Sequence, residues 1–181
     1  MPCFVVLLRG VNVGKANRVP MAAFKSLLEG LGYTNVSTLL NSGNAVFSST
    51  GRSAAQHSSA IADALMKSLG FSVATVVKSG AELAAIVAAS PIAVPESEHA
   101  KFLVAFATES SSLEGLEVLQ SLTRLPERLV VGEEAAYLYC ASGIHESKVA
   151  AALRGNVGKA VTTRNWATVR KLVALCNARA D

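Results

Sequence analysis

The hydrophobic residues in the first half of the chain follow two spacings, which predict strands and helices in a fixed order. Compact apolar runs predict strands, and apolar residues three or four positions apart predict amphipathic helices. The segment from Asn41 to Asn44 separates two short apolar runs and has the Gly and Asn that a tight turn with positive φ requires. The expected elements are strands at 2–8, 36–40, 45–47 and 72–77 and helices at 20–31 and 53–69, in the order βαββαβ.

The second half of the chain repeats this order of elements. Its expected strands are at 101–107, 128–131, 135–140 and, briefly, 160–162, and its expected helices are at 113–122 and 147–153. A trailing helix is expected after each half, at 81–89 and at 165–178. Residue identities are not visibly repeated, so the repeat lies in the order of the elements.

The order βαββαβ is that of the ferredoxin-like split βαβ unit, an antiparallel sheet with two helices on one face. We therefore predict an α+β protein of two such units, residues 1–90 and 100–181, each with its trailing helix. The boundary falls in 90–99, a segment with prolines and charges and little periodicity. A single fused sandwich is the alternative.

The composition is that of a globular protein. With 181 residues, 51% of them hydrophobic, the chain is long enough for one large core or two smaller ones. Its longest apolar stretches, such as 102–107, are well short of the roughly 20 residues that a membrane-spanning helix needs. The start of the chain lacks the basic region of a secretory signal, so we expect a cytoplasmic protein without membrane contact.

The cysteines and histidines favour structural roles. Cys3, Cys140 and Cys176 are an odd number and widely separated, and two of them lie in apolar patterns where thiols usually act as small core residues. We therefore expect unreactive structural thiols at Cys140 and Cys176. No Cys/His spacing typical of zinc is present, so the sequence predicts no metal site, and it identifies no cofactor.

Polar clusters at the ends of predicted elements are the candidates for a functional site. One follows the first strand, from Arg9 to Gly14, and another, from Thr162 to Trp166, lies at the expected start of the last helix. A guanidinium at a strand end offers a planar fork to phosphate or carboxylate, and helix N-termini bind anions. Arg164 stands where the helix dipole disfavours a cation, and a bound anion would offset that cost.

Both clusters also have a structural interpretation. An ion pair of Arg9, in a turn built by Asn12, would explain the first cluster without a ligand. Helix capping by Thr162, Thr163 and Asn165 would explain the second, with the tryptophan as a packing residue. These interpretations and the functional ones predict different effects of substitution.

An anion-binding protein is the function that the clusters favour. The proposed ligands of a phosphate-bearing small molecule or a nucleotide segment are Arg9, Asn12, Lys159, Thr163, Arg164 and Asn165, in a cleft between the two units. The loop from Gly155 to Lys159 lacks the spacing of an NTPase phosphate loop. The net charge of +4 permits contact with phosphates, although no run of Lys and Arg marks a nucleic-acid groove.

Two other functions use some of the same residues. An enzyme acting on a phosphate- or carboxylate-bearing substrate would need an acid or base such as Glu133, Glu134 or His145. An RNA-binding module would need exposed aromatics for base stacking, for which Tyr137 and Tyr139 are the convenient pair. The sequence has no paired carboxylates or nucleophile spacing that names a reaction.

Several short motifs occur in an order that is typical of one protein family. They are Leu7–Gly14, Val19–Met21, Gly32–Val36 and Ser42–Phe47 in the first half, and Gly143-Ile144, Ser147-Lys148 and Thr162–Trp166 in the second. The chain resembles the bacterial family known as domain of unknown function 1697, from which it departs at Lys15, where a second glycine is usual. The resemblance implies a two-part ferredoxin-like α+β protein and carries no assigned activity, cofactor or partner.

Overall fold

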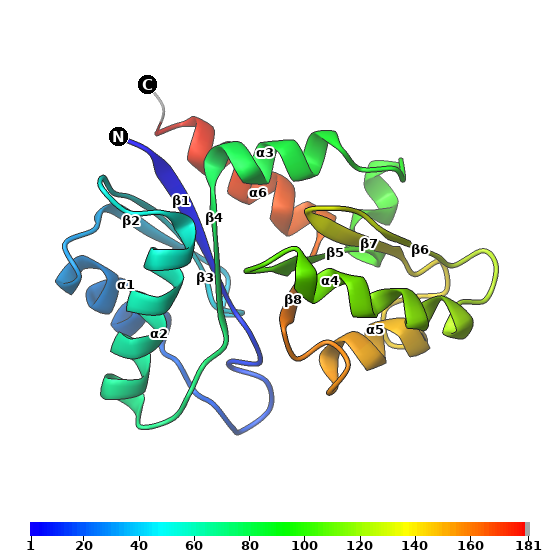
Figure 1. The fold of residues 1–181 in the computed structure, drawn as a ribbon, viewed down its shortest axis with the longest axis horizontal. Coiled ribbons are helices and arrows are strands. Elements are labelled where there is room, and N and C mark those ends of the chain that lie inside the picture. The colour runs from blue at the N-terminus through cyan, green and yellow to red at the C-terminus, as the bar shows by residue number, and fades with distance from the viewer. Residues whose placement is uncertain (180–181) are drawn as a thin grey trace. The chain divides into compact units, whose positions relative to one another are not determined.

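The computed structural model describes residues 1–179, which form two four-stranded antiparallel sheets with helices (Figure 1). In each sheet, the strands of that half of the chain lie in the order second, third, first and fourth. Both halves therefore have the same topology, and the predicted α+β fold of two βαββαβ units is confirmed. None of the helices in the described part of the chain is long and apolar enough to cross a membrane.

The chain forms two compact units. The first comprises residues 1–84 and the chain from Leu172 onward, and the second comprises residues 85–171. The elements of the first unit are β1 (Cys3–Leu8), α1 (Met21–Gly30), β2 (Thr34–Leu39), β3 (Asn44–Ser48), α2 (Ala54–Leu69) and β4 (Thr75–Ser79), followed by α3 (Gly80–Ala88), in which the boundary falls.

Helices α1 and α2 of the first unit pack on one face of its sheet. Phe4, Val6 and Leu8 alternate along β1, so their side chains share this face. Apolar side chains of the two helices, among them Phe24 and Ile61, complete the core. Each such buried side chain stabilises the fold by about 1.5–3 kcal/mol relative to its exposed state.

The second unit is built in the same way from a different sequence. Its elements are η1 (Glu96–Lys101), β5 (Phe102–Ala107), α4 (Ser111–Glu114), η2 (Gly115–Leu122), β6 (Arg128–Val131), β7 (Ala135–Tyr139), α5 (Lys148–Arg154), β8 (Val161–Asn165) and α6 (Trp166–Asn177), which continues into the first unit. The single helix expected at 113–122 is one α-helical turn followed by a 3₁₀ helix. Gly115, a poor helix former, lies where the α-helix ends.

The last strand is longer than expected. Thr163, Arg164 and Asn165, which we expected at the start of the last helix, instead complete β8 and pair with β5. Helix α6 begins at Trp166. The expectation was wrong because β-branched residues fit a strand and because the pairing partner lies some 60 residues earlier in the chain, where local spacing gives no signal.

One of the two cysteines that we expected to be free thiols forms a disulfide instead. Cys3 and Cys176 form a disulfide within the first unit, with 5.7 Å between their Cα atoms, so Cys176 is not the free thiol that we expected. A pair separated by 173 residues leaves no local pattern in the sequence. Cys140 is the free cysteine of the chain, and burial raises the pKa of its thiol to about 11, in keeping with an unreactive core residue.

Candidate functional site

The loop between β1 and α1, residues 9–18, is held in shape by one asparagine. Nδ2 of Asn12 donates to the carbonyl oxygens of Val19, at 2.8 Å, and Asn41, at 2.7 Å. Oδ1 of Asn12 accepts from the Val19 amide at 2.8 Å, and the Asn12 amide donates to the carbonyl of Asn17 at 3.0 Å. The side chain that we expected to bind a ligand therefore closes the loop and joins it to the turn before β3.

Four residues of this loop have left-handed backbone conformations. They are Gly10, Asn12, Gly14 and Asn17, whose φ values lie between 50° and 67°. Glycine and asparagine are the residues that adopt this region at least cost. Backbones that alternate between left-handed and right-handed conformations turn N–H groups into concave anion-binding arrangements. In this loop, positive φ values recur at alternate residues from Gly10 to Gly14.

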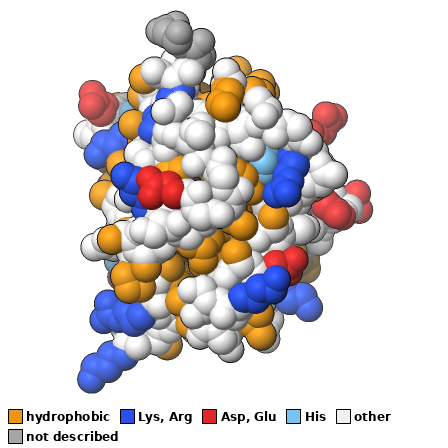
Figure 2. Space-filling view, turned by 90° about the vertical axis from the view of Figure 1, so that its left-hand side faces the viewer, with side chains coloured by type: hydrophobic (Ala, Val, Ile, Leu, Met, Phe, Trp, Pro, Cys, Tyr) orange, Lys and Arg blue, Asp and Glu red, His pale blue; other side chains and the backbone are white. Residues whose placement is uncertain are grey.

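The same loop carries much of the positive charge of the first unit. Arg9, Lys15 and Arg18 belong to it, and no acidic residue precedes Glu29. Residues 1–84 contain seven Lys and Arg against three acids, whereas the second unit contains nine of each, so the excess of positive charge lies in the first unit. At the lower left of Figure 2, Lys and Arg atoms project from the surface away from the acidic side chains in view.

The candidates in the second unit lie on or next to β8. Side chains alternate along a strand, so Thr163 and Asn165 share one face while Thr162 and Arg164 share the other. Nη1 of Arg164 donates to Oγ1 of Thr162 and to the carbonyl of Thr163, both at 2.8 Å. Burial lowers the pKa of this guanidinium to about 10. Arg164 therefore lies along its own strand and not at an exposed helix terminus.

The capping interpretation holds for one residue of the motif. Oδ1 of Asn165 accepts from the Thr168 amide at 2.9 Å, which caps the first turn of α6. Trp166 is 8% exposed and stacks on Phe102 with 4.9 Å between ring centroids, as a packing residue would. Lys159 is exposed in the turn before β8. Asn165 and Trp166 thus make contacts that stabilise the fold whether or not a ligand binds.

The aromatic pair needed for RNA stacking is engaged within the second unit. The Tyr137 hydroxyl donates to the carbonyl of Ile86 at 2.7 Å, and the side chain is buried. The Tyr139 hydroxyl donates to Oε2 of Glu98 at 3.0 Å. Since bases stack on exposed rings, the burial of Tyr137 disfavours base stacking on this pair.

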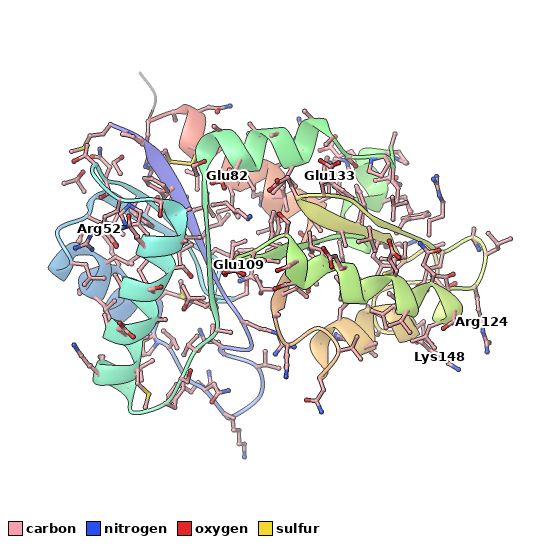
Figure 3. All side chains as sticks on the ribbon, in the orientation of Figure 1. Arg52, Glu82, Glu109, Arg124, Glu133 and Lys148 are labelled. Carbon is pink, nitrogen blue, oxygen red and sulfur yellow. A yellow bond between two sulfur atoms is a disulfide. The ribbon has the colours of Figure 1, made fainter. Side chains whose placement is uncertain are left out.

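The carboxylates considered for an enzyme lie in an acidic pocket. Glu133, labelled in Figure 3, and Glu134 line a pocket of about 550 Å³ together with Glu114 and Glu117. Four carboxylates around one pocket repel a phosphate or carboxylate. His145 is exposed in the turn before α5. Glu133 and Glu134 thus lie at a pocket whose charge disfavours an anionic substrate.

The first unit has a buried histidine that no motif in the sequence marks. His57 of α2 is fully buried, and its Nδ1 lies 2.9 Å from the Tyr33 hydroxyl. The rings of Phe4, Tyr33 and Phe47 meet it edge-on, with centroids 4.5–5.3 Å away. Its Nε2 has no hydrogen-bond partner in the described part of the chain. The spacing of His57 four residues before the core residue Ile61 was the available sequence signal.

This environment predicts a loss of stability at mildly acidic pH. Burial, and to a lesser degree the charge of Arg52, lower the pKa of His57 below its usual 6.5. The unfolded chain therefore binds a proton near pH 6.5 while the folded chain does not, so stability is fully present above about pH 6.5 and falls as the pH drops towards the folded pKa. Urea unfolding between pH 5 and 8 measures this slope. His57→Leu should reduce it and His145→Gln should not; an equal slope in all three proteins would contradict the prediction.

Comparison with known proteins assigns the chain to a family. Residues 1–137 match the family described as "Protein of unknown function (DUF1697)". The chain belongs to this family. The match confirms the resemblance seen in the motifs of the first half, and it ends before the Thr162–Trp166 motif. No curated protein matches the sequence of this DUF1697 member.

A solved structure has the same fold. It is that of the conserved bacterial protein SP0830 from Streptococcus pneumoniae, which aligns with a TM-score of 0.77 over 97% of this chain and 98% of that one. The two sequences are 23% identical. The likeness supports the fold of both units and carries no activity with it.

Proposed function

We propose that this DUF1697 protein binds a phosphate-bearing small molecule and that loop 9–18 of the first unit is the main part of its site. The observation that carries the proposal is the coincidence, in one loop, of three cations and four left-handed residues fixed by Asn12. A loop that is already ordered pays little conformational entropy when a ligand binds.

The chemistry of the loop favours phosphate over a neutral ligand. Lys15 and Arg18 are exposed, and both can reach an anion without first losing a buried contact. Each hydrogen bond between a charged group and its partner contributes about 1.5–3 kcal/mol. Two such contacts, together with backbone amides, are enough for micromolar to millimolar affinity. Lys159, Thr163, Arg164 and Asn165 are not required by this form of the proposal.

Isothermal titration with adenosine 5′-monophosphate and glycerol 3-phosphate tests the proposal. We expect binding by the wild type and a loss of about tenfold in affinity for either Lys15→Ala or Arg18→Ala, with little change in stability because both side chains are exposed. Lys67→Ala is the matched control, since it removes one exposed cation of the same unit from the last turn of α2.

Two results would count against the proposal. Equal affinities of wild type, Lys15→Ala and Arg18→Ala would show that the loop is not the site. Binding of a short oligoribonucleotide without binding of either small phosphate would favour the RNA alternative, and its affinity would fall steeply with salt.

A further inference from the structure

A small polar pocket opens in the first unit where the α1–β2 connection, the end of β3 and the segment before α2 meet. Its volume is about 240 Å³, which suits a group the size of a phosphate or a small carboxylic acid. Tyr33, Ser48, Ser49, Thr50 and Arg52 supply its polar side chains. Among the described residues that line the pocket, Arg52 is the one with a charged side chain (Figure 3).

The electrostatics of this pocket favour an anion. Arg52 is exposed and directly precedes Ser53, the N-cap of the 16-residue helix α2. The positive end of the helix dipole adds to the field of the guanidinium. The capping box of Ser53 and Gln56 holds the start of α2 in place, and this fixes the backbone that carries Arg52.

The wall of the pocket is a tyrosine whose hydroxyl is held in position from behind. Tyr33 is 4% exposed, and its ring stacks on Phe47 with centroids 4.2 Å apart. Its hydroxyl lies 2.9 Å from Nδ1 of His57, and Tyr33 and Arg52 line the same pocket. The Tyr33 hydroxyl is held in position by the buried His57 and belongs to a pocket that also contains the exposed Arg52. It is therefore preorganised for a ligand.

The two tautomers of His57 give this hydroxyl different roles. When Nδ1 is bare, it accepts the Tyr33 proton, and the hydroxyl cannot donate elsewhere. When Nδ1 carries the proton, it donates to the Tyr33 oxygen, and the tyrosine O–H is free to donate into the pocket. Since Nε2 of His57 has no hydrogen-bond partner in the described chain, no contact to that nitrogen fixes the tautomer.

We propose that this pocket is a second binding site, for a small oxyanion, in which Arg52 supplies the charge and the Tyr33 hydroxyl a hydrogen bond. The bound anion accepts the Tyr33 O–H and thereby selects the His57 tautomer that is protonated at Nδ1. The site is separate in sequence from loop 9–18 and uses none of its residues.

Titration of ¹⁵N-labelled protein with inorganic phosphate, and separately with acetate, tests the site by NMR. We expect saturable shifts of the amides of Tyr33, Ser49 and Thr50 and of the His57 ring nitrogens, whose ¹⁵N frequencies report the tautomer. Arg52→Ala should weaken this binding by tenfold to a hundredfold, because the charged contact is lost. Lys67→Ala, at the other end of α2, should bind as the wild type does.

The outcome separates this site from the proposed function. The variant with both Lys15→Ala and Arg18→Ala should keep the phosphate-induced shifts at Tyr33 and His57, whereas Arg52→Ala should keep those of loop 9–18. Unchanged affinity in Arg52→Ala, or shifts confined to loop 9–18, would overturn the second site. Shifts at Thr50 without any change at His57 would overturn the role of the Tyr33 hydroxyl.

Discussion

Removal of the Cys3–Cys176 disulfide is expected to lower the free energy of unfolding of the first unit by about 2–5 kcal/mol. The bond closes a loop of 173 residues, and the chain-entropy account gives its largest effects for long loops in the unfolded chain. It also holds the last turn of α6 against the start of β1. A Cβ added at Gly80 would lie 3.4 Å from Cβ of Cys176, so the helix packs closely on the chain at this point.

The measurement is urea unfolding of wild type and Cys3→Ser, each with and without a reducing agent. Reductant should destabilise the wild type to the level of Cys3→Ser and leave Cys3→Ser itself unchanged. A thiol count on the denatured, unreduced wild type should find one reactive cysteine, Cys140. The disulfide would be contradicted if reductant did not change the free energy of unfolding of the wild type. A count of three reactive thiols without reductant would contradict it as well.

The same variant connects the disulfide to the proposed site. Cys3 begins β1, and loop 9–18 begins where β1 ends at Leu8. A strand of this length spans about 20 Å, so the disulfide and the loop lie at opposite ends of one rigid element. Because β1 is paired on both sides, with β3 and β4, we expect Cys3→Ser to keep the loop in place and to bind phosphate-bearing ligands as the wild type does.

The architecture could be predicted from the sequence because its signals are local. Helix α1 has its apolar residues on one face, and β5 is one uninterrupted apolar run. The local spacing of apolar residues therefore predicts the type of each of these elements. The repeated order of elements then selected the ferredoxin-like unit. The prediction that failed depends on a distant contact. The end of β8 is a strand because Thr163 pairs with Ala105, and the residues next to Thr163 in the sequence do not show this pairing.

In the candidate sites, too, local features could be predicted from the sequence and contacts between distant residues could not. The sequence located loop 9–18 from its glycines, its asparagine and Arg9. It could not show that the Asn12 side chain is hydrogen-bonded to Val19 and Asn41. The pocket at Arg52 joins residues 31–33 to residues 48–52, and local spacing does not show that these two stretches meet. Sites assembled from separate loops need the fold before they can be recognised.

Substitution of Gly43 is expected to have the largest effect of any single glycine in the first unit. Gly43 has φ of 80° in the turn before β3, and its carbonyl accepts the Leu8 amide at 2.8 Å. A Cβ at this position would lie 2.6 Å from Cβ of Leu8 and 2.7 Å from Cγ2 of Val11. Both contacts are shorter than side-chain atoms tolerate, and Cβ of Leu8 cannot move without its backbone.

Gly43→Ala should therefore lower the free energy of unfolding by about 2–5 kcal/mol, the sum of left-handed strain and overpacking. Gly51→Ala is the matched control, because Gly51 also has φ of 80° but has no atom within 4 Å of the added Cβ. That variant should lose only the strain, about 1–2 kcal/mol. Urea unfolding of the two variants measures the difference. Equal losses would mean that Leu8 and Val11 do not restrict the turn, and that loop 9–18 is not held against the β2–β3 hairpin as the contacts of Gly43 and Asn12 indicate.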